Sequence, residues 1–174
     1  SYNDDTEWPC ESMNNLLSFV INNDGEEFRK GIEKYLDVDA AIDYLATTYV
    51  LGVTDNFAKN MILITYDGQK WIPNMYDLDT ACGLAFDGSK YFEYDFSVPE
   101  KNPYGKILSG TENLLWDRIL NNYTDEFKNR YFELRKDILD TENLINRYSD
   151  FIDSVEYPYN FSRDFSKLFS SNAC

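Results

Sequence analysis

The pattern of apolar and polar positions predicts three helices in the N-terminal part of the chain. After an extended, polar lead-in over residues 1–9, Ser12 is suited to cap a helix that ends at the polar run 22–25. A second amphipathic helix follows, because apolar residues recur there at every fourth position. Asp37 is a good N-cap for a third helix, whose wide apolar stripe is typical of burial. The apolar positions of these helices are Leu16, Leu17, Val20 and Ile21, then Phe28, Ile32 and Leu36, then Val38, Ala41, Ile42, Leu45, Ala46 and Tyr49.

The next stretch has the pattern of a β-hairpin. Residues 61–66 are apolar and predict a strand, Asp67 and Gly68 predict a tight turn, and residues 70–76 predict the return strand. Residues 83–113 lack periodicity and carry several Tyr and Phe residues among Gly and Pro. We expect them to form a long, ordered loop that packs its aromatic side chains against the core.

Helical spacing returns in the C-terminal part of the chain. Leu114 opens an apolar helical pattern, and Thr124 and Thr141 are suited to cap two further helices. Pro158 separates off a short last segment at residues 161–169. The predicted fold class is α+β, mainly α, with helices around one central hairpin. The 174 residues fit a single domain, 1–174.

Composition narrows the classes of partner. A hydrophobic content of 43% and an aromatic content of 17% suffice for a core, which argues against global disorder. The net charge of −15 argues against nucleic acid, because phosphate contacts need an excess of Lys and Arg. The same charge suits a basic protein partner or bound cations, and it equally suits simple solubility.

Two residue types limit the chemistry. The chain has no His, which excludes His-dependent triads and ordinary catalytic zinc sites. Its three cysteines, Cys10, Cys82 and Cys174, match no metal spacing, and their odd number leaves at most one intrachain disulfide. No apolar run has the length of a membrane span, and the polar N-terminal residues do not form a signal peptide.

Two acidic clusters flank the hairpin. Asp55 is followed five positions later by Asn60, and Asp77 and Asp79 come directly after the return strand. Because a hairpin brings its outer ends together, we expect these four side chains to lie close to one another. Carboxylate and amide oxygens without any His suit a hard cation such as Mg²⁺, and phosphoryl transfer is the chemistry that most often needs such a cluster.

Each cluster has a plainer interpretation when taken alone. The spacing of Asp55 and Asn60 also occurs in capped turns, and Asp-x-Asp is common at helix caps. Their order, with a strand, a turn and a second strand between them, matches the catalytic loop and the metal-binding loop of a kinase-like lobe. Lys59 either neutralises phosphate charge beside Asn60 or balances the neighbouring acids.

The combined motifs resemble the CotH family, the spore-coat-protein-H-like atypical kinases. The resemblance rests on the runs 35–46, 55–60, 71–73 and 77–79 with Gly83, and it covers about residues 10–155. It implies a protein-kinase-like C-lobe, ATP with Mg²⁺ or Mn²⁺, and phosphate transfer to serine in protein substrates, which the acidic surface would prefer rich in Lys and Arg. It also suggests a spore-surface or extracellular location.

The resemblance implies a role for each residue of the two clusters. Asp55 would be the catalytic-loop aspartate that orients or deprotonates the acceptor hydroxyl, and Asn60, Asp77 and Asp79 would hold the metal. Lys59 and Asn60 are our candidates for binding the nucleotide, because they lie together in the first cluster. The family's N-terminal, nucleotide-clamping lobe has no counterpart in this sequence, so we expect the chain to be part of a longer protein.

Two other functions stay open at this point. The same scaffold can serve as an inactive binding or structural module on a spore, cell-surface or appendage protein, with residues 83–113 making the contacts. A Ca²⁺-stabilised domain without chemistry ranks last, because the EF-hand pattern is absent. The sequence leaves the oligomeric state open.

Overall fold

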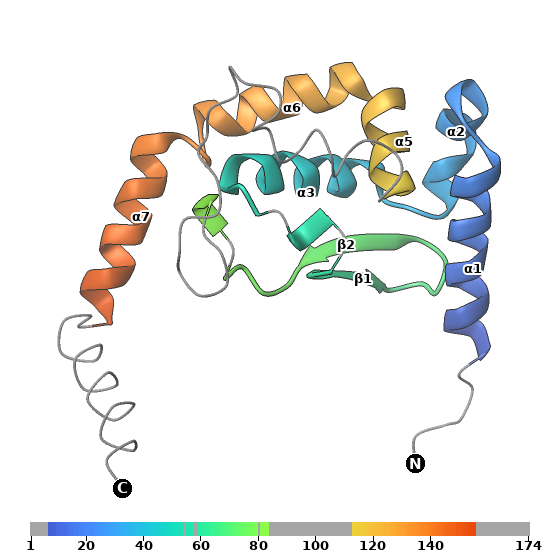
Figure 1. The fold of residues 1–174 in the computed structure, drawn as a ribbon, viewed down its shortest axis with the longest axis horizontal. Coiled ribbons are helices and arrows are strands. Elements are labelled where there is room, and N and C mark those ends of the chain that lie inside the picture. The colour runs from blue at the N-terminus through green and yellow to red at the C-terminus, as the bar shows by residue number, and fades with distance from the viewer. Residues whose placement is uncertain (1–6, 54, 58, 80, 84–112, 156–174) are drawn as a thin grey trace, which may run out of the picture. The chain divides into compact units, whose positions relative to one another are not determined.

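A computed structural model describes residues 7–53, 55–57, 59–79, 81–83 and 113–155 (Figure 1). This part of the chain contains six α-helices and one two-stranded antiparallel sheet, in agreement with the predicted α+β, mainly α class. The helices are α1 (Glu7–Asn22), α2 (Gly25–Gly31), α3 (Val38–Leu51), α5 (Leu114–Asn122), α6 (Thr124–Lys136) and α7 (Thr141–Ser154). The strands are β1 (Met61–Thr65) and β2 (Trp71–Met75), and the short 3-10 turns are η1 (Ile32–Lys34), η2 (Asp55–Phe57) and η3 (Ala81–Gly83).

The chain divides into two compact units, Ser1–Phe132 and Glu133–Cys174. The first unit holds the hairpin and the helices around it, and α6 continues through the boundary between the two. The assignment of the chain to one domain stays a prediction. No helix among the described residues is long and apolar enough to cross a membrane.

Three predicted helix starts are wrong by a residue or more. Helix α1 begins at Glu7, so Ser12 lies inside it, and Pro9 is tolerated because the first turn needs no N–H donor there. Thr124 is already helical, and its hydroxyl donates to the Leu120 carbonyl. The cap of α7 is Asp140, which accepts from Glu142 N at 2.9 Å, one residue before the predicted Thr141.

The predicted cap of α3 is confirmed. The Asp37 carboxylate accepts a hydrogen bond from Ala40 N at 3.0 Å, which satisfies one of the exposed donors of the first turn. Gly52 ends the helix with a φ of 63°, a left-handed conformation that glycine adopts without strain. The helix therefore delivers the chain to η2 at a defined point.

The predicted second helix is shorter than its apolar spacing suggests. Helix α2 ends at Gly31, and the chain continues through η1 to Leu36. A Cβ at Gly31 would come within 2.5 Å of the Phe19 Cζ atom, so a larger residue there would displace the Phe19 ring. Phe28, Ile32 and Leu36 are nevertheless fully buried, as their spacing predicted.

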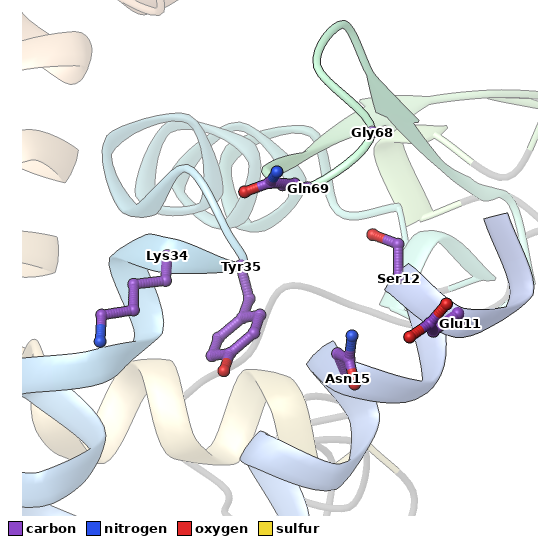
Figure 2. Close-up of a pocket in the computed structure, with 7 residues that line it drawn as sticks. All are labelled: Glu11, Ser12, Asn15, Lys34, Tyr35, Gly68 and Gln69. Carbon is purple, nitrogen blue, oxygen red and sulfur yellow. The ribbon is translucent and has the colours of Figure 1, made fainter. Parts of the chain in front are cut away.

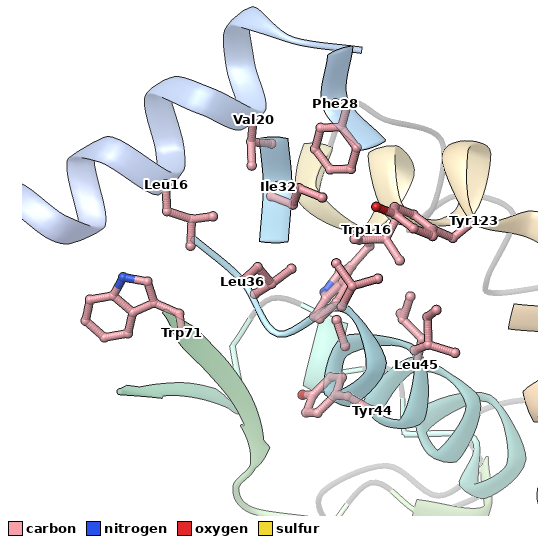
Figure 3. Packing of buried hydrophobic residues seen from close by; sticks show 14 of the residues in the cluster. Leu16, Val20, Phe28, Ile32, Leu36, Tyr44, Leu45, Trp71, Trp116 and Tyr123 are labelled. Atoms are coloured by element: carbon pink, nitrogen blue, oxygen red, sulfur yellow. The ribbon is translucent and has the colours of Figure 1, made fainter. Parts of the chain in front are cut away.

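One hydrophobic core joins α1, α2, η1, α3, β2 and α5 (Figure 3). Full burial of each large apolar side chain stabilises the fold by roughly 1.5–3 kcal/mol relative to exposure. The hairpin is attached to this core at one end of β2, where Trp71 N donates to Tyr35 O and Asp37 N donates to Trp71 O, both at 2.8 Å. The core side chains labelled in Figure 3 are Leu16, Val20, Phe28, Ile32, Leu36, Tyr44, Leu45, Trp71, Trp116 and Tyr123.

The hairpin loop is wider than the predicted tight turn. Strand β1 ends at Thr65 and strand β2 begins at Trp71, and the loop between them closes around the Asp67 side chain. Its Oδ1 accepts hydrogen bonds from Gln69 N and Lys70 N, both at 2.8 Å. The expected loop 83–113, apart from its end residues Gly83 and Asn113, lies outside the described residues, and so does the whole of the last segment 161–169.

Candidate functional site

The open end of the hairpin brings together the two segments that the sequence singled out. Strands β1 and β2 are antiparallel, with Met61 opposite Met75, so the chain entering β1 lies beside the chain leaving β2 (Figure 1). The first segment is η2 with the turn up to Asn60, and the second is residues 76–79. We refer to these two segments together as the hairpin-end site.

Asn60 connects the two segments. Its backbone carbonyl accepts a hydrogen bond from Tyr76 N at 3.1 Å, which extends the hairpin ladder by one pair. Its side-chain Nδ2 donates to the Asp77 carbonyl at 3.2 Å. The expected proximity of Asn60 and Asp77 is therefore observed. With Nδ2 used in this bond, Oδ1 is the amide atom that can act as a cation ligand.

Asp77 and Asp79 both have exposed side chains. Asp77 has a φ of 53°, in the left-handed region that few residues other than Gly, Asn and Asp adopt. Such conformations cost of order 1–3 kcal/mol and occur mainly where the surrounding structure holds them, often at functional sites. Asp79 follows in the turn before η3.

Asp55 and Lys59 belong to the first segment. Asp55 opens η2, directly ahead of the buried Asn56, and its side chain is not among those described. Lys59 lies in the turn next to Asn60 with an exposed side chain. Their chemical roles stay predictions.

Two buried side chains support η2 from the core. The Tyr44 hydroxyl on α3 donates to the Asn56 carbonyl at 2.6 Å, and Trp116 Nε1 on α5 donates to the Phe57 carbonyl at 2.9 Å. The two rings stack with centroids 5.3 Å apart and planes at 9°. Asn113, the cap of α5, also donates to the Phe57 carbonyl. Because these carbonyls are held by rigid helices, η2 has a fixed position relative to the core.

Sequence reasoning did not assign a functional role to Tyr44, Asn56 or Trp116. Tyr44 lies in the predicted third helix beside its apolar stripe, and Asn56 directly follows Asp55, so both lie next to residues that the sequence singled out. Trp116 carried none, because its contact with η2 joins residues far apart in sequence. Phe57 and Trp71 are buried in the core, whereas Tyr76 has a relative exposure of 60%.

Burial changes the ionisation of two tyrosines below the site. Loss of hydration raises the pKa of Tyr44 to about 12 and that of Tyr49 to about 12. Both phenols are therefore neutral at physiological pH, and the Tyr44 hydroxyl remains a hydrogen-bond donor. Neither tyrosine can serve as a base at neutral pH.

The donor set at the hairpin end suits Mg²⁺ or Mn²⁺ by type. Asn60, Asp77 and Asp79 offer amide and carboxylate oxygens, and Mg²⁺ commonly takes one or two protein carboxylates while waters and substrate phosphates complete its shell. Within the described part of the chain, no group of three or more His, Cys, Asp or Glu side chains is placed to hold a metal.

A cavity of about 450 Å³ lies at the opposite end of the hairpin (Figure 2). Side chains from α1, from the end of η1 and from the hairpin loop form its walls, and nearly all of them are polar. It is separate from the hairpin-end site, because the loop and the open end are opposite ends of the same strands. The lining residues are Glu11, Ser12, Asn15, Lys34, Tyr35, Gly68 and Gln69.

Comparison with known proteins gives one result. The family model described as "CotH kinase protein" matches residues 2–168, nearly the whole chain. Neither the curated proteins nor the solved structures contain a match to this sequence.

Proposed function

The chain belongs to the CotH kinase protein family, and we propose that its hairpin-end site takes part in metal-dependent phosphoryl transfer from ATP to a protein hydroxyl group. Family membership supports a kinase-like domain in general and, with it, ATP and a divalent metal. Beyond this, we propose which residues bind the metal, nucleotide and acceptor, and which class of substrate the chain takes.

The observation that carries the proposal is the contact between Asn60 and Asp77. Asn60 precedes β1 and Asp77 follows β2, so the whole hairpin separates them in sequence. In the structure, Asn60 Nδ2 donates a hydrogen bond to the Asp77 carbonyl at 3.2 Å. In kinase-like enzymes the corresponding pair of segments, the catalytic loop and the metal-binding loop, must face one phosphate group. The contact therefore supports a C-lobe-like arrangement in which both segments serve a single site.

The proposed roles follow the chemistry of each group. Asn60 Oδ1 and the carboxylates of Asp77 and Asp79 would hold the cation, which neutralises charge on the phosphates when bound. Asp55 would orient the acceptor hydroxyl and take its proton. Lys59 would neutralise phosphate charge beside Asn60. A protein segment rich in Lys, Arg and Ser suits an acceptor for a chain with a net charge of −15.

The test measures ATP binding by calorimetry, with and without Mn²⁺, on the whole chain and on Asp77→Asn. Asn tolerates the left-handed φ of Asp77 but removes the carboxylate charge, so loss of affinity reports on the metal rather than on folding. We expect Mn²⁺-dependent binding in the unchanged chain and a loss of about 10–100-fold in the variant. Asp125→Asn, an equal charge change at an exposed position of α6, is the matched control.

The same preparation separates binding from chemistry. Asp55→Ala should retain Mn²⁺-dependent ATP binding while phosphate transfer to a Ser-containing basic peptide falls by about 10²–10⁴-fold. Absence of Mn²⁺-dependent binding in the unchanged chain, or equal binding by Asp77→Asn, would contradict the proposal.

One observation favours the second function, a kinase-like module that binds without catalysing. The Asn60 side-chain nitrogen is used in a backbone contact, as expected of a purely structural turn. In that case the exposed Asp77 and Asp79 would contribute only surface charge. Both Asp77→Asn and Asp55→Ala would then leave every nucleotide measurement unchanged.

A further inference from the structure

Asn56 is a fully buried amide between the two segments of the hairpin-end site. Its relative exposure is 0%, and it lies in η2 directly after Asp55. Its Nδ2 donates to the Asn60 carbonyl at 2.7 Å and to the Tyr76 carbonyl at 3.1 Å. Both amide hydrogens are thus used on carbonyl oxygens, one in each segment. The orientation of the amide follows, because Oδ1 cannot replace Nδ2 in front of two acceptors.

These bonds control the backbone of Asp77 from both sides. The Tyr76 carbonyl, held by Asn56, belongs to the peptide plane before the Asp77 Cα. The Asp77 carbonyl, held by Asn60 Nδ2, belongs to the plane after it. The orientations of these two planes define φ and ψ of Asp77. The φ of Asp77 is 53°, a left-handed conformation that is unfavourable for a residue with a Cβ, and hydrogen bonds on both adjacent peptide planes oppose its relaxation.

Asn56 is itself held by the core. Its carbonyl accepts the Tyr44 hydroxyl at 2.6 Å, and the next carbonyl along the chain accepts Trp116 Nε1 at 2.9 Å. No donor among the described residues reaches Asn56 Oδ1. A buried polar atom without a partner costs stability, and the two donor hydrogens of the same amide offset this cost by satisfying two backbone carbonyls.

We propose that Asn56 is the positioning residue of the hairpin-end site, a buried amide that holds the Asp77 backbone in its left-handed conformation and so aims the Asp77 carboxylate at the cation. The proposal rests on the proposed function for the role of that carboxylate. Asn56 acts through Asp77 and Asn60 and touches neither nucleotide nor acceptor.

The test compares Asn56→Leu with Thr48→Val. Leu has the same branched arrangement of heavy atoms as Asn, with bulkier methyl groups, but donates no hydrogen bond, so the Asn60 and Tyr76 carbonyls lose a donor. Thr48 is also 0% exposed, and its hydroxyl makes one hydrogen bond to a backbone carbonyl, that of Tyr44 at 2.8 Å, away from both segments. The two variants therefore lose buried hydrogen bonds in the same core, but only one of them touches the site.

Two readouts distinguish positioning from general stability. The first is the affinity for ATP in the presence of Mn²⁺, which should fall about 10–100-fold in Asn56→Leu and stay unchanged in Thr48→Val. The second is hydrogen exchange of the Tyr76 amide, which donates to the Asn60 carbonyl at 3.1 Å. This exchange should accelerate in Asn56→Leu beyond the change that its global stability explains.

The two proposals fail in different ways. If the unchanged chain shows no Mn²⁺-dependent ATP binding, the proposed function is wrong, and Tyr76 exchange alone decides whether Asn56 holds the segment. Equal exchange and equal affinity in the two variants would overturn the role of Asn56. Should Asn56→Leu fail to fold, Asn56→Ser retains one donor hydrogen. It should then show an intermediate loss of affinity, and unchanged affinity would overturn the proposal.

Discussion

At the scale of single residues, buried polar side chains hold the two segments of the hairpin-end site. Tyr44, Asn56 and Trp116 are buried, and each directs a donor at a backbone carbonyl of one of the two segments. A buried carbonyl without a donor costs about 1–3 kcal/mol, so each of these side chains restricts where its segment can lie. The Asp77 and Asp79 side chains are exposed instead, so a ligand can reach them.

Tyr44 gives a test at this scale. Tyr44→Phe removes the hydroxyl that donates to the Asn56 carbonyl, and we expect a loss of about 1 kcal/mol in the free energy of unfolding at neutral pH. Chemical denaturation followed by fluorescence measures this loss. An unchanged denaturation midpoint would mean that the hydrogen bond adds nothing to stability.

The same variant predicts a change at high pH. Burial raises the pKa of Tyr44 to about 12, above the ordinary value near 10, so the folded state favours the neutral phenol. Its contribution to stability is complete below about pH 10 and is lost as the pH rises from about 10 to about 12. Stability should therefore fall less steeply in Tyr44→Phe over this interval. Tyr49 and Tyr123, whose pKa values burial also raises, contribute to the slope in both proteins.

At the scale of elements, the β-hairpin is the structure that creates the site. A two-stranded hairpin is marginal by itself, and this one gains its stability from the core through Trp71, Leu63, Met61 and Met75. Its loop sets the register that places Met61 opposite Met75, and this pairing in turn places Asn60 beside Tyr76. A change in the loop should therefore weaken the pairing of Asn60 with Tyr76 at the opposite end of the strands.

Asp67 tests the stability of the loop itself. Backbone N–H groups of Lys70 and Gln69 hold the pKa of the Asp67 carboxyl below its usual range, so the folded state favours the carboxylate. We expect Asp67→Ala to lower the denaturation midpoint at neutral pH and to accelerate exchange of the Gln69 and Lys70 amides. The carboxylate's contribution is complete above about pH 3.9 and is lost as the pH falls below it, so the difference from the unchanged chain should shrink in acid.

Asp67→Asn is the control for this prediction. Asn keeps an oxygen that can accept from Gln69 and Lys70 but has no charge. It should retain most of the protection of these amides without the pH dependence. Unchanged exchange in Asp67→Ala would contradict the importance of this loop for the hairpin.

At the scale of the whole molecule, the open question is cooperativity between two compact units. The boundary lies between Phe132 and Glu133, and helix α6 (Thr124–Lys136) passes through it without interruption. A continuous helix couples the ordering of the residues on its two sides. We therefore predict one cooperative unfolding transition, as expected for the single domain 1–174.

The positions of the tryptophans allow this prediction to be measured. The chain has three Trp residues, at positions 8, 71 and 116, and all of them precede the boundary. Tryptophan fluorescence therefore reports on the first unit, whereas far-UV circular dichroism also reports on helix α7 in the second. Coincident transitions by the two probes are expected. A separate transition seen by circular dichroism alone would show that the two units unfold independently.

The local features of this chain were determined by the sequence itself. The apolar spacing located the buried faces of Phe28, Ile32 and Leu36, and the Asp37 cap follows from a short-range hydrogen bond within one helical turn. The hairpin and the proximity of Asn60 to Asp77 also follow from local patterning, because an antiparallel pair necessarily joins its outer ends. Errors at Ser12, Thr124 and Thr141 arose because several residues near each helix start were able to serve as its cap.

The tertiary structure decided what holds the site in place. The donors that reach η2 come from α3 and α5, and the residues in contact, such as Trp116 and Phe57, are far apart in sequence. No local pattern encodes such a pairing, because it depends on how several helices pack around one core. The left-handed backbone conformation of Asp77 was likewise decided by tertiary contacts. Its sequence permits that conformation, but the amides of Asn56 and Asn60 select it.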